Sequence, residues 1–230
     1  MTLKLYTLCG ADTARHFSPH VWKTVMSLHH KGLDFEECPT PFTAIPEIEG
    51  GATKTVPLLV DGDTMIVDSF AIAEYLEETY PDAPSLFGGA GGVAAARFVE
   101  RWSLTHMYVP LRSIIIMDIF NRLSEKDQAY FRSTREVRFG KPLEELAAGG
   151  AAQIDALSAN LEPMRQTLSF HPFLGGEAPL FSDYIVFGGL QWARVISPIK
   201  LLADDDPVSA WFERCLDLFE GAGRKVPAAA

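Results

Sequence analysis

The order of apolar and polar residues near the N-terminus predicts short β-strands. Residues 3–8 alternate between apolar and polar side chains, which is typical of a strand with one buried face. Residues 58–60 form a short apolar run bounded by turn residues, as in a buried strand. The turn pair Asp61-Gly62 follows and is a strong hairpin signal, so residues 65–67 are expected to pair back antiparallel.

Two helix starts accompany these strands. Ser18-Pro19 combines a preferred N-cap with the residue favoured at the first helical position, and Gly32 is placed to end that helix. Residues 34–38 favour a second strand, parallel to the first. Asp68-Ser69 opens another helix with apolar residues at helical spacing. The order βαβ followed by ββα predicts a thioredoxin-like α/β domain over residues 1–84.

The second part of the chain shows helical periodicity and almost no strand pattern. A glycine-rich segment at residues 86–92 is typical of a linker, and we place a domain boundary there. An all-α domain is expected over residues 93–225. Its expected helices are 93–121 with a kink at Pro110, 125–146, 151–168, 181–196 and 207–219. The fourth is apolar on most sides, which predicts a helix buried in the core.

Composition and charge exclude several function classes. The 230 residues carry a formal net charge of −10 and the sequence pI is about 5.0, which argues against nucleic-acid and anionic-membrane partners. No apolar run approaches the ~18 residues of a membrane span, and the N-terminus lacks a signal-peptide pattern. Cys9, Cys38 and Cys215 are odd in number and widely spaced, which indicates free thiols in a reducing compartment. No Cys/His spacing predicts a metal site.

Ser18 is the candidate for chemistry. A helix N-terminus carries unpaired amides and partial positive charge. A hydroxyl at that point can donate a hydrogen bond to a neighbouring thiolate, which lowers the thiol pKa from its free value near ~8.5. The alternative is that Ser18 only caps its helix. Asp68 and Ser69 present a similar choice, because they either cap their helix or bind a ligand, Ser69 an anion and Asp68 an amino group.

Other nucleophiles are less well supported by the sequence. Cys9 is a rival, but residues 10–12 do not start a helix after it and the chain has no Cys-x-x-Cys pair. His16 and His20 lie near Ser18 in the sequence, yet a loop and a first helical turn favour solvated side chains. Since no His-and-acid pair in recognisable order accompanies Ser18, we expect a hydrogen-bonding role and not nucleophilic attack.

Several strings of residues, in matching order, resemble the glutathione transferase superfamily. The resemblance is greatest to the bacterial lignin β-aryl etherases and the related fungal transferases. The strings that carry it are Phe17-Ser18-Pro19-His20-Val21-Trp22-Lys23-Thr24, His30-Lys31-Gly32, Ile72-Ala73-Glu74-Tyr75-Leu76, Asp183-Tyr184, Asp205-Asp206-Pro207 and Asp217-Leu218-Phe219-Glu220-Gly221.

The chain departs from this family in two places. Known etherases of this kind have a longer C-terminal tail. The family also places Ser or Thr three residues before Asp183, where this chain has Leu180. Either Ser182 caps the helix differently, or Asp183 caps it alone.

The resemblance implies a glutathione site in the first domain. Val56-Pro57 would carry a cis peptide bond, and the backbone of Val56 would pair with the cysteinyl unit of glutathione. Ser69 would donate to the γ-glutamyl carboxylate, Asp68 would accept from the α-amino group and Lys54 would pair with the glycyl carboxylate. Ser18 would stabilise the thiolate, with no metal involved.

The resemblance also implies a reaction. Glutathione thiolate would attack the carbon that bears an aryl ether beside a ketone, phenolate would leave and a thioether would form. The aromatic electrophile would lie in an apolar cleft between the domains. A transferase or peroxidase for other electrophiles, and a non-catalytic binder of aromatic compounds, are the alternatives. A homodimer in the cytoplasm is expected.

Overall fold

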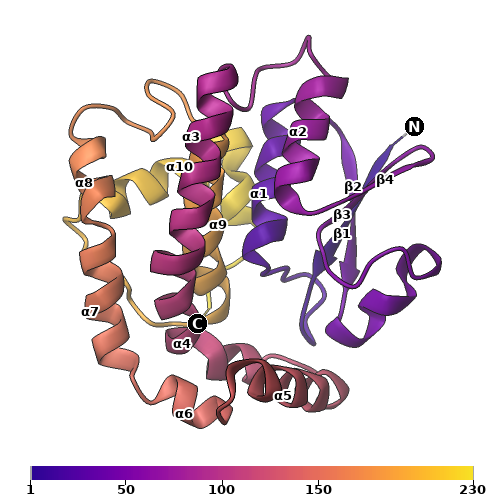
Figure 1. Cartoon of the computed structure of the whole chain (residues 1–230), viewed down its shortest axis with the longest axis vertical. Coiled ribbons are helices and arrows are strands. Elements are labelled where there is room, and N and C mark those ends of the chain that lie inside the picture. The colour runs from indigo at the N-terminus through magenta and orange to yellow at the C-terminus, as the bar shows by residue number, and fades with distance from the viewer. Residues whose placement is uncertain (1, 230) are drawn as a thin grey trace.

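The first half of the chain forms a mixed β-sheet with helices packed beside it (Figure 1), in a computed structural model that describes residues 2–229. The strand order is β2-β1-β3-β4, in which β1 and β2 are parallel and the other neighbours are antiparallel. This confirms the predicted thioredoxin-like order. The elements are β1 (Leu3–Leu8), α1 (Pro19–His30), β2 (Phe35–Thr40), the 3-10 segment η1 (Phe42–Gly50), β3 (Leu58–Asp61), β4 (Thr64–Val67) and α2 (Ser69–Thr79).

Helix α1 begins and ends as the sequence predicts. Ser18 has extended dihedral angles, and its side chain accepts a hydrogen bond from the amide of Val21. Pro19 occupies the first helical position, where its missing N–H costs nothing. Gly32 adopts a φ of +66° directly after the C-cap, a conformation that glycine takes readily.

The second half of the chain is helical, as predicted. In Figure 1, α7 and α8 run along the left edge, while α5 and α6 lie at the bottom. The elements are α3 (Ala90–Trp102), the π-helical segment η2 (Ser103–Met107), α4 (Tyr108–Asn121), α5 (Glu125–Phe139), α6 (Leu143–Ala147), α7 (Gly150–Asn160), α8 (Glu162–Leu168), α9 (Phe181–Ile196) and α10 (Pro207–Lys225). Helix α9 has the predicted bounds and is buried along nearly its whole length. No helix among residues 2–229 is both long and apolar enough to span a membrane.

The expected long helix at residues 93–121 begins three residues earlier, at Ala90, and the irregularity expected at Pro110 is a π-helical turn just before that residue. A π-helical turn separates α3 from α4. Proline lacks the N–H that would bond to the carbonyl four residues earlier, and its ring crowds that carbonyl. That carbonyl belongs to His106, and it accepts a hydrogen bond from the Asn160 side chain at 2.7 Å instead.

Three other helix bounds also need correction. Residues 125–146 form two helices. Gly140 ends α5 because it adopts a left-handed conformation with a φ of +68°, and Pro142 directly precedes α6. Residues 151–168 divide into α7 and α8, with Pro163 in the first turn of α8. Helix α10 continues to Lys225 after a non-helical interruption at residues 218–221.

Asp183 caps α9 alone, which decides between the two alternatives left by Leu180. Its carboxylate accepts hydrogen bonds from the amides of Leu174 at 2.7 Å, Gly175 at 2.9 Å and Leu180 at 3.0 Å. It also accepts one from the indole of Trp211 at 2.9 Å. Burial raises the pKa of Asp183, and these four donors oppose that shift.

The two halves of the molecule meet where α1 crosses α9. Gly188 on α9 lies so close to Pro19 that a Cβ atom would be 2.3 Å from the Pro19 carbonyl oxygen. The same interface contains a buried ion pair, because Lys23 Nζ on α1 lies 3.4 Å from a carboxylate oxygen of Glu100 on α3. The first turn of α1 is therefore held by the helical domain.

Substitution of Gly188 by Ala should destabilise the fold. Replacement of a helical glycine normally gains about 0.5–1 kcal/mol. Here the added methyl meets backbone, and overpacking costs about 1–3 kcal/mol, so we expect a net loss. Gly91→Ala is the matched control, since nothing lies within 4 Å of its Cβ position. Urea unfolding should show a lower midpoint for Gly188→Ala only. Equal midpoints would contradict the close contact.

Candidate functional site

Ser18 lies at the edge of a cavity of about 410 Å³ between the two halves of the molecule. Its side chain is largely buried, and its Oγ accepts the Val21 amide at 3.4 Å. Within residues 2–229 the hydroxyl donates no hydrogen bond to another protein group. The Ser18 proton is thus available to a ligand at the N-terminus of α1.

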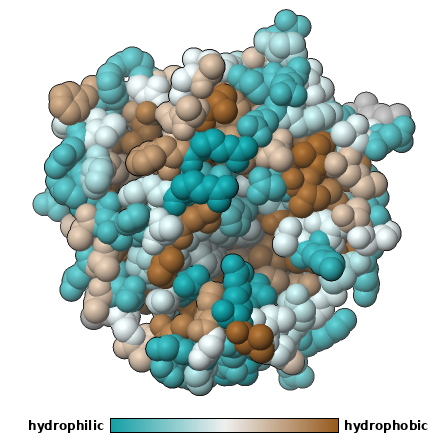
Figure 2. Space-filling view, viewed as in Figure 1, coloured by the Kyte–Doolittle hydropathy of each residue, from teal (hydrophilic) through white to brown (hydrophobic). Residues whose placement is uncertain are grey.

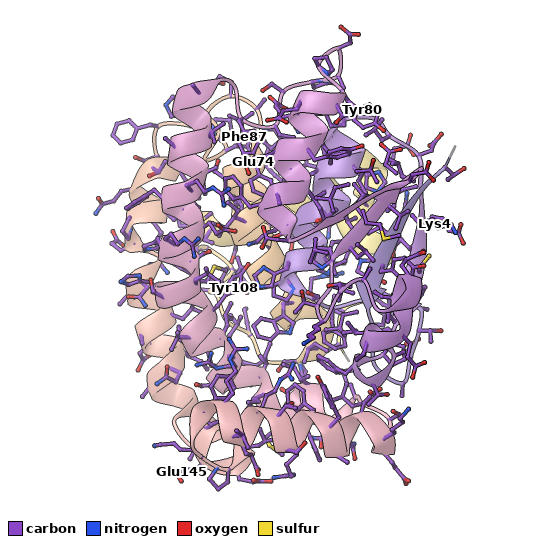
Figure 3. The ribbon with its side chains drawn as sticks, turned by 45° about the vertical axis from the view of Figure 1, so that its right-hand side comes forward. Lys4, Glu74, Tyr80, Phe87, Tyr108 and Glu145 are labelled. Atoms are coloured by element: carbon purple, nitrogen blue, oxygen red, sulfur yellow. The ribbon has the colours of Figure 1, made fainter. Side chains whose placement is uncertain are left out.

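The cavity has a largely aromatic wall. Figure 2 shows a hollow near the centre of this face, where α1, α4 and α5 meet. Figure 3 shows Tyr108 in the interior, between the helices on the left and the sheet domain on the right. The aromatic side chains that line the cavity are Phe17, Phe42, Tyr108, Phe131, Phe139 and Trp192, and His20 lies edge-on to Tyr108.

A second cluster of predicted site residues comes together through the hairpin register. Leu58 pairs with Val67 across β3 and β4. The residues just before Leu58 and just after Val67 are therefore brought to the same end of the hairpin. These are Val56-Pro57 and Asp68-Ser69, so four residues that the sequence singles out lie together at one end of the hairpin.

The peptide bond between Val56 and Pro57 is cis. Val56 is half-buried, and Thr53 organises the preceding turn by donating to the Thr55 carbonyl at 2.7 Å. Lys54 is exposed and forms no ion pair within the part of the chain that the structure describes. Its ammonium group is available to an anion beside Val56.

Asp68 and Ser69 form the N-terminus of α2. Asp68 adopts a φ of +81°, and its side chain accepts the amides of Phe70 at 2.9 Å and Ala71 at 3.1 Å. Capping is therefore a real role of Asp68. The buried hydroxyl of Ser69 has no hydrogen-bond partner among the described residues. A buried polar atom without a partner is costly, and a ligand group at this helix N-terminus would satisfy it.

The Asp68 charge connects this cluster with the first turn of α1. Burial lowers the pKa of His20 to about 3, and the negative charge of Asp68 opposes that shift. Burial also lowers the pKa of Lys23, again with Asp68 acting in the opposite direction. The charge of Asp68 thus acts on both side chains of α1, and α2, which Asp68 caps, packs against α1.

The expectation that His16 and His20 are solvated is wrong. His16 is 6% exposed, and its Nδ1 lies 2.8 Å from a carboxylate oxygen of Glu37. His20 is half-buried against Tyr108 and stays neutral at physiological pH because of its depressed pKa. Sequence position alone did not reveal the burial of either histidine. The loop before α1 folds back, and the backbones of Cys9 and His16 form an isolated antiparallel β-bridge.

Cys9 does not have the features of a nucleophile. Its side chain is fully buried in the structure, and burial raises its pKa to about 11. A reactive cysteine requires the opposite shift, because the thiolate is the attacking species. Ser18 is therefore the better placed of the two groups. Within residues 2–229, no three His, Cys, Asp or Glu side chains cluster as metal ligands.

Three arginines of the cavity were not singled out by the sequence. Arg112 comes from α4, and Arg135 and Arg138 come from α5. The i, i+3 spacing of the latter two places them on one face of a helix, which was visible in the sequence. What the sequence did not show is that this face turns toward Ser18.

Comparison with known proteins assigns this architecture to a family. The sequence profile of the glutathione S-transferase C-terminal domain matches residues 94–218. The profile of the glutathione S-transferase N-terminal domain matches residues 13–84. The chain therefore belongs to the glutathione S-transferase family.

Relatives and solved structures agree with this assignment. The chain is 27% identical over 217 residues to the glutathione S-transferase-like protein ustS of Aspergillus flavus, covering 79% of this chain and 76% of that protein. Glutathione transferase GSTFuA3 from Phanerochaete chrysosporium is 26% identical, with a TM-score of 0.76 over 98% of this chain and 94% of that one. CsGST63524 of Ceriporiopsis subvermispora, solved in complex with glutathione, is 24% identical with a TM-score of 0.81, covering 96% and 98%, and shows the likeness of fold.

Proposed function

We propose that this protein transfers glutathione to an aromatic electrophile. The observation that carries the proposal is the position of Ser18, which lines the aromatic cavity at the N-terminus of α1 and whose hydroxyl donates to no described protein group. Glutathione would lie at this end of the β3–β4 hairpin, with its cysteinyl unit against the Val56 backbone. Its γ-glutamyl end would reach Asp68 and Ser69, and Lys54 would attract the glycyl carboxylate.

In the proposed reaction Ser18 donates a hydrogen bond to the glutathione thiolate. The amides at the start of α1 add partial positive charge, so the thiol pKa falls and more thiolate is present at neutral pH. The thiolate attacks an electrophilic carbon, a C–S bond forms and the bond to the leaving group breaks. The protein supplies orientation of two substrates and a cavity lined by aromatic rings, and no side chain becomes covalently attached.

Within this class we propose a β-aryl ether beside a ketone as the electrophile. The C–O bond then breaks, phenolate leaves with the electron pair and a glutathione thioether of the ketone remains. Support comes from the resemblance of residues 17–24 to the etherases and from a cavity wall suited to aromatic rings. The homodimeric state and the cytoplasmic location stay predictions.

Incubation with glutathione and a β-aryl ether ketone tests this reaction. Mass spectrometry should detect both the free phenol and the glutathione thioether in equal amounts. A generic chlorinated nitroaromatic serves as the control electrophile. Turnover of the control alone would reject the β-aryl ether and leave the transferase. Failure with every electrophile, despite bound glutathione, would reject transfer and favour a binding protein.

Removal of the Ser18 hydroxyl should raise the pKa of bound glutathione. A hydrogen bond to a charged group contributes about 1.5–3 kcal/mol, so Ser18→Ala should lower the rate at neutral pH about 10- to 150-fold. The hydroxyl stabilises the thiolate, so its loss moves the pKa upward, and the deficit should shrink as the pH rises. The measurement is the ultraviolet absorbance of the bound thiolate against pH, together with the pH–rate profile.

Ser18→Thr is the control for this prediction, because threonine keeps both the hydroxyl and the helix cap. It should retain most of the activity and a low thiol pKa. Complete loss of activity in Ser18→Ala with an unchanged thiol pKa would contradict the role and indicate covalent chemistry at Ser18.

Asp68 and Ser69 should contribute to glutathione affinity beyond their role in capping. Asp68→Asn keeps an acceptor for the two helix amides and tolerates the positive φ, but removes the charge that would hold the α-amino group. Ser69→Ala removes the unpartnered hydroxyl. Calorimetry should show about 10-fold or greater weakening of glutathione binding in each, at the low end of a charged hydrogen bond. Unchanged affinity in both variants would show that these residues only cap α2.

A further inference from the structure

The cavity beside Ser18 is positively charged in an acidic protein. Arg112, Arg135 and Arg138 line it, and no Asp or Glu does. The whole chain has 30 acidic residues against 20 Lys and Arg. Three cations together without an acid are thus contrary to the overall composition, which makes the cluster informative about what the cavity holds.

Aromatic rings, not carboxylates, hold these arginines. The guanidinium carbon of Arg112 lies 4.1 Å from the centre of the Phe139 ring, and that of Arg138 lies 5.5 Å from the same ring. Arg135 lies over Phe131 at 4.8 Å and over Phe42 at 4.9 Å. Stacking of this kind fixes a guanidinium through its face and leaves its N–H groups to donate in the plane. One Arg135 Nη1–H donates to Thr134 Oγ1 at 2.9 Å, and the other N–H groups remain for a ligand.

None of the three arginines forms a salt bridge within residues 2–229, whereas a neighbour on α5 does. Arg132 pairs with Glu136 at 2.8 Å and with Glu144 at 2.7 Å. Arg132 thus finds acidic partners on α5 and α6, whereas no Asp or Glu lines the cavity that the other three arginines face. An arginine that only packed into the cavity wall could keep an acidic partner. The lack of one therefore indicates that these charges have another role.

The unpaired charges carry an electrostatic cost. Burial lowers the pKa of Arg112 and of Arg135, and the charge of Arg138 lowers both further. The Nε atom of Arg112 is buried and has no hydrogen-bond partner among the described groups. A bound anion would relieve both problems, because it offers opposite charge and an acceptor at once.

The remaining wall of the cavity restricts the shape of that anion. Aromatic residues from both domains surround the arginines, and His20 stays neutral because of its depressed pKa. Arginine presents two parallel N–H donors, which match the two oxygens of a carboxylate. The cavity therefore combines a surface for an aromatic ring with a fork for a planar anionic group.

We propose that the electrophile accepted by this protein is an aromatic compound that carries a carboxylate, which Arg112 and Arg135 bind while Arg138 attracts it from the exposed rim. This inference rests on the proposed transferase function and adds the charge of the second substrate to it. The proposed function assigns the two glutathione carboxylates to Ser69 and Lys54, at the end of the β3–β4 hairpin and on the sheet side of Ser18. The arginines belong to the helical side, where the electrophile lies.

A matched pair of electrophiles tests the inference. Glutathione displaces chloride from 4-chloro-3,5-dinitrobenzoate and from 4-chloro-3,5-dinitrobenzamide by the same reaction, with a C–S bond formed and a C–Cl bond broken. Only the first carries a carboxylate. Arg112→Met should raise the KM for the benzoate about 10- to 150-fold, the value of a charged hydrogen bond, with little change in kcat. The KM for the neutral compound and for glutathione should change less than about twofold, since neither places a carboxylate on this arginine.

Arg214→Met is the matched control. Arg214 also stacks on a phenylalanine, Phe173 at 5.8 Å, but it lies outside the cavity. It should change neither substrate's KM. An equal fall in kcat for both electrophiles in Arg112→Met would overturn the inference, because it would mean that the arginine stabilises charge in the transition state. A raised KM for glutathione alone would overturn it as well.

A binding experiment separates this inference from the proposed reaction. Calorimetry compares 3,5-dinitrobenzoate with 3,5-dinitrobenzamide, neither of which has a leaving group. The wild-type protein should bind the benzoate at least about 10-fold more tightly, and Arg112→Met should abolish that preference. Equal affinity would reject the carboxylate site. A clear preference without turnover of any electrophile would retain the site and reject the transferase function.

Discussion

The close contact between α1 and α9 is the constraint on which the site depends. At Gly188 the two helices approach until only a hydrogen fits beside the Pro19 carbonyl. This contact fixes the first turn of α1, and with it Ser18, against the helical domain. The buried pair of Lys23 and Glu100 adds an electrostatic link across the same interface. The proposed catalytic group, Ser18, therefore belongs to one domain but is positioned by the other, so that a thiolate bound beside it would face the aromatic cavity.

Local signals explain which parts of the fold could be predicted. Ser18-Pro19, Asp61-Gly62 and Gly32 specify a helix start, a hairpin and a helix end through backbone chemistry that needs no distant partner. In the second domain Pro110 indicated the irregular turn, but the helix breaks at Gly140 and before Pro163 were missed, because each signal lies inside a periodic pattern. At Pro110 the freed carbonyl finds Asn160, fifty residues later in the chain, and no local rule reveals that partner.

In the candidate site, too, the residues placed by local structure could be predicted and those placed by distant contacts could not. Val56-Pro57 and Asp68-Ser69 could be placed together, because the register of the β3–β4 hairpin brings them to the same end. The arginines could not, because their placement depends on how α4 and α5 pack against the loop before α1. The burial of His16 was also out of reach, since it depends on Glu37 in a separate strand. Contacts between segments distant in sequence thus account for the residues that were missed.

The charge distribution shows why net charge is a poor guide to a ligand. A value of −10 argues against large polyanions, whose many phosphates sample the whole surface. Inside the cavity the nearest charges dominate, because screening by water and salt is weak there. Arg112 and Arg135 keep their charge against burial and against Arg138, supported by aromatic faces and not by acids. An acidic surface with a cationic interior repels bulk anions at long range and holds a small one only where an aromatic ring can enter with it.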